Sequence, residues 1–119
     1  MPRTRGYAGA MSKHDRTTQR VREAAGQRIL FLPHAVRQMA RPDRMRTGGE
    51  VRDVVLKGRL IEDYPDDPRG HSCLLLGLGS EGRPIHVVCS PRPEYLAIVT
   101  AYLPDPSEWT RGFTHRSRS

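Results

Sequence analysis

The sequence predicts an α+β fold in which a short N-terminal strand and two helices pack on one face of an antiparallel sheet. Apolar runs of strand length alternate with turn residues between Leu60 and Tyr102. One short apolar run and two segments with helix-like spacing precede them. The chain has 119 residues, which is room for one domain with a modest core.

The N-terminal segment, residues 1–28, is expected to be a basic and mostly disordered tail. Residues 1–14 contain almost no apolar side chains. Asp15 is a plausible N-cap for a helix that reaches Gln27, but the apolar stripe of this helix is thin. We therefore expect the helix to be frayed rather than firmly docked.

The first strand and helix of the domain follow one another directly. Ile29–Leu32 predicts a short buried strand, which Pro33 ends. Proline suits the first turn of a helix, and this helix is expected to continue to Met39. Arg41-Pro42 stops it, because the residue before a proline is disfavoured in the helical conformation.

A second helix is expected from Glu50 to Lys57. Three valines within it are spaced i, i+3, i+4, which places them on one face. Gly58 follows as the residue that ends the helix.

Four strands complete the predicted sheet, at Arg59–Tyr64, His71–Leu78, Pro84–Cys89 and Tyr95–Leu103. Ser80-Glu81-Gly82 is a natural tight turn between the second and third of these. Counting back from this turn places Leu76 opposite His86 and Cys73 opposite Cys89. Thr100 and Tyr102 alternate with apolar neighbours and share one face, on which Leu96 and Ile98 are also expected.

The formal net charge of +7 lies in the two ends of the chain. Residues 1–28 carry seven basic and two acidic side chains, and the C-terminal tail, 111–119, carries three basic ones. The domain between them, residues 29–110, carries ten basic and eleven acidic side chains. Basic tails attract phosphate backbones without sequence preference, and the alternative is that they only keep the chain soluble.

Composition also bounds the class of protein. No run of 18 apolar residues is present, so no membrane span or membrane partner is expected. The basic N-terminus is not followed by an apolar segment typical of a secretion signal. Two cysteines are too few for a disulfide scaffold, so we expect a cytoplasmic protein with reduced thiols.

A set of short segments occurs in one order from Ile29 to Trp109. They are Pro33-His34-Ala35, Arg37, Val51 to Gly58, Ile61 to Asp67, Ser72-Cys73-Leu74, Gly77, Gly82 to Val88 and Thr100 to Trp109. In this order they resemble the uncharacterised bacterial DUF family numbered four-two-five-eight. The sequence departs from that family at 41–46, where members usually have a shorter turn.

That family is in turn similar to the RelE-like ribonuclease toxins. The similarity implies a strand, two helices and an antiparallel sheet. It also implies a metal-independent endoribonuclease of toxin–antitoxin type, or a degenerate relative, with RNA and a small antitoxin protein as partners. Fold similarity does not by itself carry function.

His34 and Arg37 are the first candidate site residues. They lie one helical turn apart and so share a face. Histidine suits general acid–base chemistry near neutral pH, and the planar arginine fork matches two phosphate oxygens. The alternative is a histidine that caps its helix beside a solvated arginine.

His86, Thr100 and Tyr102 are further candidates. His86 interrupts an apolar strand, so its ring needs a partner or a cleft, and a buried, satisfied histidine is the alternative that its apolar neighbours favour. Tyr102 could hold a phosphate or orient a base, or it could simply pack its ring and bond through its hydroxyl.

A metal site and a bound cofactor are not expected. His71, Cys73, His86 and Cys89 have the chemistry of zinc ligands. The predicted register, however, turns His86 away from the other three. No glycine-rich phosphate loop, no serine–histidine–aspartate signature and no paired catalytic carboxylates are present.

The sequence-based hypothesis is attack of an RNA 2′-hydroxyl on the adjacent phosphate, which leaves a 2′,3′-cyclic phosphate. His34 is the base or acid, Arg37 stabilises the phosphorane, and Tyr102 orients or donates. The alternatives are a non-catalytic module that binds RNA or protein, and a small domain whose polar residues are structural.

Overall fold

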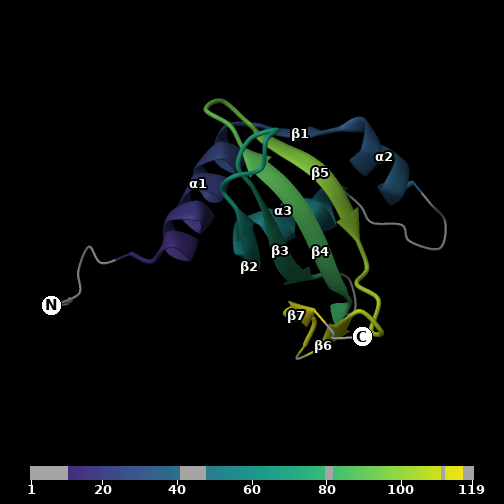
Figure 1. Cartoon of the computed structure of the whole chain (residues 1–119). Helices are drawn as coiled ribbons and strands as arrows, with labels where there is room; N and C mark the ends of the chain where they lie inside the picture. The colour runs from purple at the N-terminus through teal and green to yellow at the C-terminus, as the bar shows by residue number, and fades with distance from the viewer. Residues whose placement is uncertain (1–10, 41–47, 80–81, 111, 117–119) are drawn as a thin grey trace, which may run out of the picture.

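The computed structural model describes residues 11–40, 48–79, 82–110 and 112–116 (Figure 1). The elements in chain order are α1 Lys13–Gln27, β1 Ile29–Phe31, α2 Pro33–Met39, α3 Gly48–Lys57, β2 Arg59–Tyr64, β3 Ser72–Leu78, β4 Pro84–Pro91, β5 Leu96–Tyr102, β6 Trp109–Thr110 and β7 His115–Arg116. None of the helices in these ranges is long and apolar enough to cross a membrane.

Five strands form one sheet in the order β1-β5-β4-β3-β2. Strands β2 to β5 are antiparallel neighbours, and β1 pairs with β5 in parallel. The predicted α+β class is confirmed, but the sheet is mixed rather than purely antiparallel. Parallel pairing needs a long connection, and most of the chain lies between β1 and β5.

The predicted register of the central hairpin is confirmed. Leu76 pairs with His86, and Cys73 pairs with Cys89. The predicted turn residues Ser80 and Glu81, like the loop at 41–47, lie outside the described residues. Because side chains alternate between faces, this register fixes which residues of β3 and β4 face the helices.

A β-bulge in β5 overturns one sequence-based prediction. Val88 pairs with Thr100, but its neighbour Cys89 pairs with Ile98, so one residue of β5 is unpaired. Leu96 and Ile98 therefore face the core, whereas Thr100 points to the opposite face. The prediction that all of them share a face is wrong, because it assumed unbroken alternation.

Helix α1 is firmly docked, so the prediction of a frayed helix that docks weakly is wrong. Ser12 is the N-cap in place of the predicted Asp15, and the two residues form a capping box at the start of the helix. Its inward face is completely or almost completely buried and consists of Thr17, Val21, Ala24 and Ala25. These small side chains let the helix approach the sheet closely, so a thin apolar stripe is enough to dock it. The prediction that residues 1–14 are disordered is wrong for Ser12 to His14, which cap and begin the helix, and residues 1–10 lie outside the described residues.

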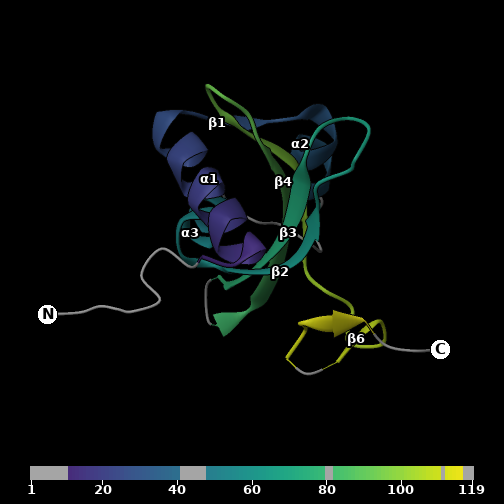
Figure 2. The same ribbon diagram turned by 60° about the vertical axis from the view of Figure 1, so that its left-hand side comes forward.

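Helices α1 and α3 lie side by side over one face of the sheet (Figure 2). The core forms between them and the sheet, and Val51, Val54 and Val55 of α3 are fully buried or nearly so. Gly77 of β3 allows this close approach, because an added Cβ would lie 2.7 Å from Cγ2 of Val54. Helix α2 packs beside β5, off the end of β1 (Figure 1).

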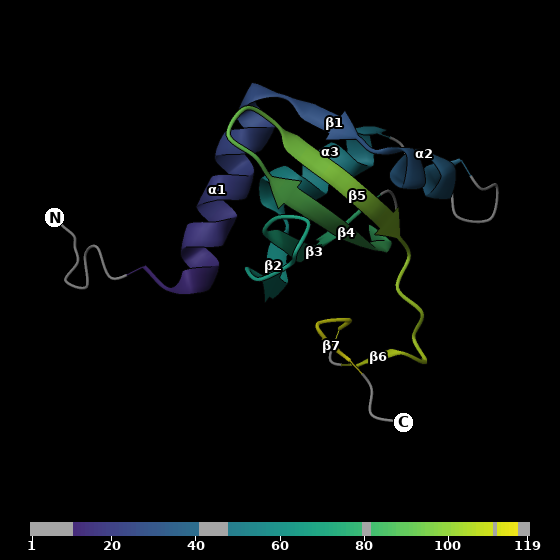
Figure 3. The same ribbon diagram turned by 45° about the horizontal axis from the view of Figure 1, so that its top comes forward.

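The C-terminal segment forms a small ribbon below the sheet, in which β6 pairs with β7 (Figure 3). We call residues 109–116, where described, the C-terminal ribbon. The assignment of 111–119 to a tail outside the domain is wrong for residues 112–116, which belong to this ribbon. Arg116 has a carboxylate partner on β2, Glu62, which local sequence does not reveal.

The docking of α1 can be tested with Val21→Ala. Val21 has no exposed surface, so its truncation should lower the free energy of unfolding by roughly 2 kcal/mol. Val36→Ala is the matched control, because Val36 is 52% exposed on α2 and its truncation should cost much less. Urea denaturation measures both. Equal losses in the two variants would contradict a docked α1.

Candidate functional site

The sheet face that points away from α1 and α3 carries the candidate site, and we call it the open face. Alternation from the observed register places Glu62, Tyr64, Ser72, Leu74, His86, Val88, Ser90, Thr100 and Tyr102 on it. Three residues predicted from the sequence, His86, Thr100 and Tyr102, are therefore on one face of adjacent strands.

His86 is fully buried on this face and satisfied at both ring nitrogens. Its Nε2 lies 2.9 Å from the carbonyl oxygen of Phe113. A carbonyl can only accept, so Nε2 carries the proton and Nδ1 accepts from the hydroxyl of Tyr102 at 3.2 Å. Burial lowers the pKa of His86 and outweighs the hydrogen bond to Phe113 and the nearby charge of Glu62, both of which raise it. The ring is thus held neutral in one tautomer.

Two aromatic rings enclose His86. Tyr102 meets it edge-to-face with ring centroids 5.2 Å apart, and Trp109 does so at 4.4 Å. Phe113, whose carbonyl binds the ring, has a φ of 70°. A non-glycine residue pays a conformational cost in this region, so the contacts of the ribbon must hold it there.

An ion pair anchors the C-terminal ribbon to β2. Arg116 donates from Nε and Nη2 to the two carboxylate oxygens of Glu62, at 2.8 and 2.9 Å. Its guanidinium carbon lies 4.7 Å from the centre of the Trp109 ring. The hydroxyl of Tyr64 also donates to Glu62. The ribbon therefore closes over His86 through one salt bridge and one stacked ring.

The protonation of this network follows from its contacts. Burial disfavours the charged form of Glu62, but hydrogen bonds from Arg116 and Tyr64 outweigh it and lower the pKa of Glu62. Burial, together with the hydrogen bond to Glu62, raises the pKa of Tyr64. Burial also raises the pKa of Tyr102. At neutral pH the two tyrosines are therefore neutral and Glu62 is ionised.

His34 and Arg37 are exposed on α2. Within the described ranges, no hydrogen bond, ion pair or ring contact joins either of them to His86, Thr100 or Tyr102. Their helix packs beside β5, the strand that carries Thr100 and Tyr102. The convergence of His34, Arg37 and Tyr102 in one cleft stays a prediction.

The partners that complete the network are not among the candidate residues that the sequence predicts. They are Glu62, Trp109 and Arg116. One signal was available: Gly112 between Trp109 and Arg116 is typical of a hairpin turn, and its φ is 69°.

A second polar cluster, also missed, connects α1 to the sheet. Nε2 of His71 lies 2.5 Å from Asp63, and Nδ1 lies 2.9 Å from Nη1 of Arg20. Arginine only donates, so Nδ1 accepts and Nε2 donates to the carboxylate. Thr17 donates to the other oxygen of Asp63 at 2.9 Å. These contacts orient His71 toward α1 and explain part of the docking of that helix.

The potential zinc ligands are divided between the two faces. Sγ of Cys73 and Sγ of Cys89 are 3.8 Å apart in the core, and both are free thiols. His71 binds Asp63, whereas His86 lies on the open face. No group of three or more metal-ligating side chains occurs in the part of the chain that the structure describes.

The loop between β2 and β3 is anchored by Asp67. This carboxylate accepts from the backbone N–H of Arg69 at 3.0 Å and from the hydroxyl of Ser72 at 2.8 Å. These hydrogen bonds, with that of the Arg69 side chain, lower the pKa of Asp67 to about 2. The carboxylate is therefore ionised and fully engaged near neutral pH.

A hollow of about 490 Å³ lies between α3 and the ends of β2 and β3. It contains none of the predicted site residues, and its polar side chains are Asp53, Lys57 and Arg59. We favour the open face as the candidate site, because convergent polar groups and shifted pKa values identify a functional site better than volume does.

A family model described as Domain of unknown function (DUF4258) matches residues 31–103. The match includes His34, Arg37 and the residues of the open face, but not α1 or the C-terminal ribbon. No curated protein and no solved structure matches the chain.

The state of the thiols and the expected independence from metal ions can be tested together. Chelation should change neither stability nor activity, because His86 cannot join Cys73 and Cys89 across the sheet. Unfolding without reductant should expose two thiols to Ellman's reagent, whereas the native protein should react slowly, since both sulfurs are buried. Stoichiometric zinc in the purified protein would contradict this.

The anchoring role of Asp67 predicts an acid-sensitive stability. Its pKa is depressed in the folded chain, so its contribution is present above the usual pKa of about 3.8 and is lost as the pH falls toward 2. Carbon-13 NMR of the carboxyl group should give a pKa of about 2. Ser72→Ala removes one donor and should raise that pKa toward its ordinary value. A wild-type pKa near 3.8 would refute the anchoring role.

Proposed function

We propose that this chain, which belongs to the DUF4258 family, is a RelE-like, metal-independent endoribonuclease of toxin–antitoxin type. The observation that carries the proposal is the Tyr102–His86 pair on the open face. A phenol donates to an imidazole whose tautomer is fixed by the carbonyl of Phe113. This pair can accept a proton from a substrate hydroxyl without forming a free tyrosinate.

In the proposed reaction, the RNA 2′-oxygen forms a bond to phosphorus and the bond from phosphorus to the 5′-oxygen breaks. The 2′-hydroxyl gives its proton to Tyr102, which passes its own proton to Nδ1 of His86. Burial disfavours the imidazolium that results, and the carbonyl of Phe113 and the charge of Glu62 offset part of this effect. Tyr102 touches substrate in this scheme, and His86 is a positioning and proton-storing residue behind it.

His34 and Arg37 complete the proposed centre from α2. The imidazolium of His34 protonates the departing 5′-oxygen, and the guanidinium of Arg37 stabilises the charge on the phosphorane. Support comes from the exposure of both side chains and from the packing of α2 beside β5. The products are a 2′,3′-cyclic phosphate and a free 5′-hydroxyl.

RNA and a small antitoxin protein are the proposed partners. The excess of basic residues at both ends of the chain supports RNA binding. Leu30 and Val36 are 38% and 52% exposed around the end of β1 and α2, which supports a protein partner there. The free cysteines are consistent with the proposed cytoplasmic location.

The second candidate is a non-catalytic module that binds RNA or protein. The full burial of His86, with both nitrogens occupied, favours it, because such a ring is also what a purely structural histidine looks like. In this alternative the hydrogen bonds of His86 hold the C-terminal ribbon in place. The exposed residues His34 and Arg37 then bind RNA or a partner protein without catalysing a reaction.

Cleavage of single-stranded RNA in the presence of a chelator tests the proposal. His34→Ala and Tyr102→Phe should each reduce the rate by about 10²–10⁴-fold, as expected for the loss of a general acid or base. His14→Ala is the matched control, because His14 is exposed on α1, and it should leave the rate unchanged. The product should carry a cyclic phosphate.

Binding measured in parallel separates the two candidates. Wild-type protein that binds RNA without cleaving it would support the non-catalytic module. Cleavage that survives both substitutions would remove His34 and Tyr102 from the mechanism. Circular dichroism and urea denaturation should show that both variants remain folded, with Tyr102→Phe losing roughly 1–3 kcal/mol because Nδ1 of His86 loses its donor.

A further inference from the structure

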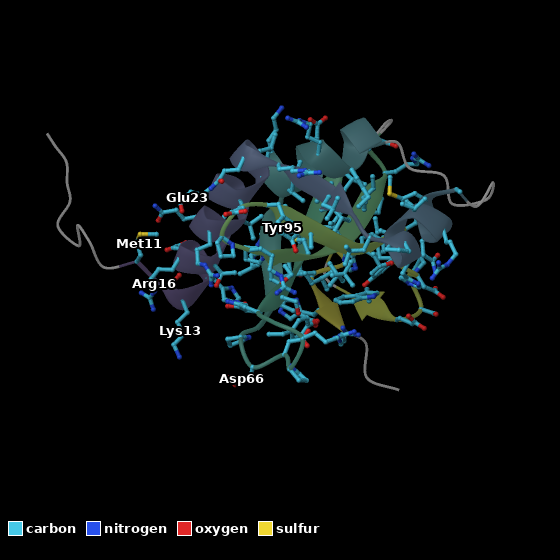
Figure 4. The ribbon with its side chains drawn as sticks, turned by 90° about the horizontal axis from the view of Figure 1, so that it is seen from above. Met11, Lys13, Arg16, Glu23, Asp66 and Tyr95 are labelled. Atoms are coloured by element: carbon cyan, nitrogen blue, oxygen red, sulfur yellow. The ribbon has the colours of Figure 1, made fainter. Side chains whose placement is uncertain are left out.

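The end of the sheet opposite the C-terminal ribbon carries a second group of polar side chains. Two loops meet there, residues 65–71 between β2 and β3 and residues 92–95 between β4 and β5, beside α1. Figure 4 looks onto this end, with Tyr95 near the centre, Asp66 at the tip of the other loop and Glu23 on α1. A side chain of one loop donates a hydrogen bond to the backbone of the other.

Arg92 connects the two loops and is incompletely satisfied. Its Nη2 donates to the carbonyl oxygen of Arg69 at 2.8 Å. Its Nε is buried and has no hydrogen-bond partner among the described residues. No carboxylate in those ranges forms an ion pair with Arg92. A buried, unpaired donor on a charged group is costly, so this position favours an acceptor that carries negative charge.

The loop backbone is fitted closely around this guanidinium. Gly70 has a φ of 118°. An added Cβ there would lie 2.9 Å from Nη1 of Arg92 and 3.0 Å from both its Cζ and its Nη2. Only glycine combines this backbone conformation with this approach. The hydrogen bond from Nη2 to Arg69 and the burial of Nε keep the guanidinium beside this loop.

Arg92 borders two hollows, and their linings differ. One, of about 180 Å³, also contains Glu23, whose charge opposes an anion. The other, of about 200 Å³, lies on the open face, and we call it the Tyr64–Arg92 hollow. Its polar lining is Tyr64, Asp67, Arg69, Ser72, Ser90 and Arg92. The single carboxylate in that list, Asp67, is already engaged by Arg69 and Ser72.

The lining of the Tyr64–Arg92 hollow suits a nucleotide. Arg92 offers a donor, and the side chain of Arg69, which is 83% exposed, adds a second guanidinium that also pairs with Asp67. Tyr64 and the apolar residues offer surface to a base or ribose. Val88, which lines the hollow, pairs with Thr100, so the hollow adjoins the proposed centre along the sheet.

We infer that the Tyr64–Arg92 hollow is an RNA subsite that holds one phosphate on Arg92 and packs the attached nucleoside against Tyr64. That the ligand is RNA rests on the proposed function. That the ligand carries a phosphate rests only on the unsatisfied guanidinium of Arg92. The subsite holds a nucleotide next to the one that is cleaved, and it sets the position of the strand on the open face.

Binding of a labelled 2′-O-methyl RNA octamer tests the subsite, because this probe lacks the attacking hydroxyl and cannot be cleaved. Arg92→Gln should weaken binding at least tenfold, as expected for the loss of a charged hydrogen bond. It should also reduce the slope of the logarithm of the binding constant against the logarithm of the salt concentration by about 0.7. This is the value for one phosphate contact on a single strand. Arg52→Gln, an exposed arginine on α3, is the charge-matched control and should change binding little.

A second measurement does not depend on how the variant folds. In the wild-type protein, the Nε–H resonance of Arg92 should shift on titration with adenosine 5′-monophosphate, and the Nε–H of Arg52 should not. Equal effects of Arg92→Gln and Arg52→Gln on octamer binding would overturn the subsite and leave RNA binding intact. Failure of wild-type protein to bind the octamer would overturn the RNA function. A monophosphate shift at Arg92 would then still support a nucleotide site, and its absence would overturn the subsite too.

Discussion

The β-bulge in β5 is the constraint on which both faces of this sheet depend. One unpaired residue between Ile98 and Thr100 reverses the alternation of side chains within a single strand. Leu96 and Ile98 can then enter the core under α1 and α3, and Tyr102 can still face His86 on the open side. Without the bulge, one end of β5 would expose its apolar residues or bury its polar ones.

Helix α1 and the C-terminal ribbon lie outside the family match, and each covers one face of the sheet. Helix α1 closes the core on one side, and the C-terminal ribbon closes over His86 on the other. Both are attached by charged or polar contacts as well as by packing, through Asp63 with His71 for α1 and through Glu62 with Arg116 for the ribbon. Adjacent residues of the edge strand β2 thus serve opposite faces, as strand alternation requires.

The net positive charge of the chain overstates the charge that is available to the proposed RNA ligand. Arg116 is committed to Glu62, and Arg22 donates to backbone carbonyls at the end of α3. Arg92 differs from both, because the fold holds it in place without satisfying it. The open face therefore pairs a neutral phenol–imidazole centre with a separate cationic contact. A ligand that is both hydroxylic and phosphorylated would use the two at once.

The sequence by itself determined the elements of the sheet and the central hairpin, because apolar periodicity, prolines and turn residues act locally. It also placed His86 opposite Leu76 and turned it away from the cysteines, since a short turn leaves little freedom in register. Only the tertiary structure decided the parallel pairing of β1, the docking of α1 and the closure of the ribbon. Each of these depends on partners far apart in the chain, such as Arg116 and Glu62, and no local pattern encodes a contact across 54 residues.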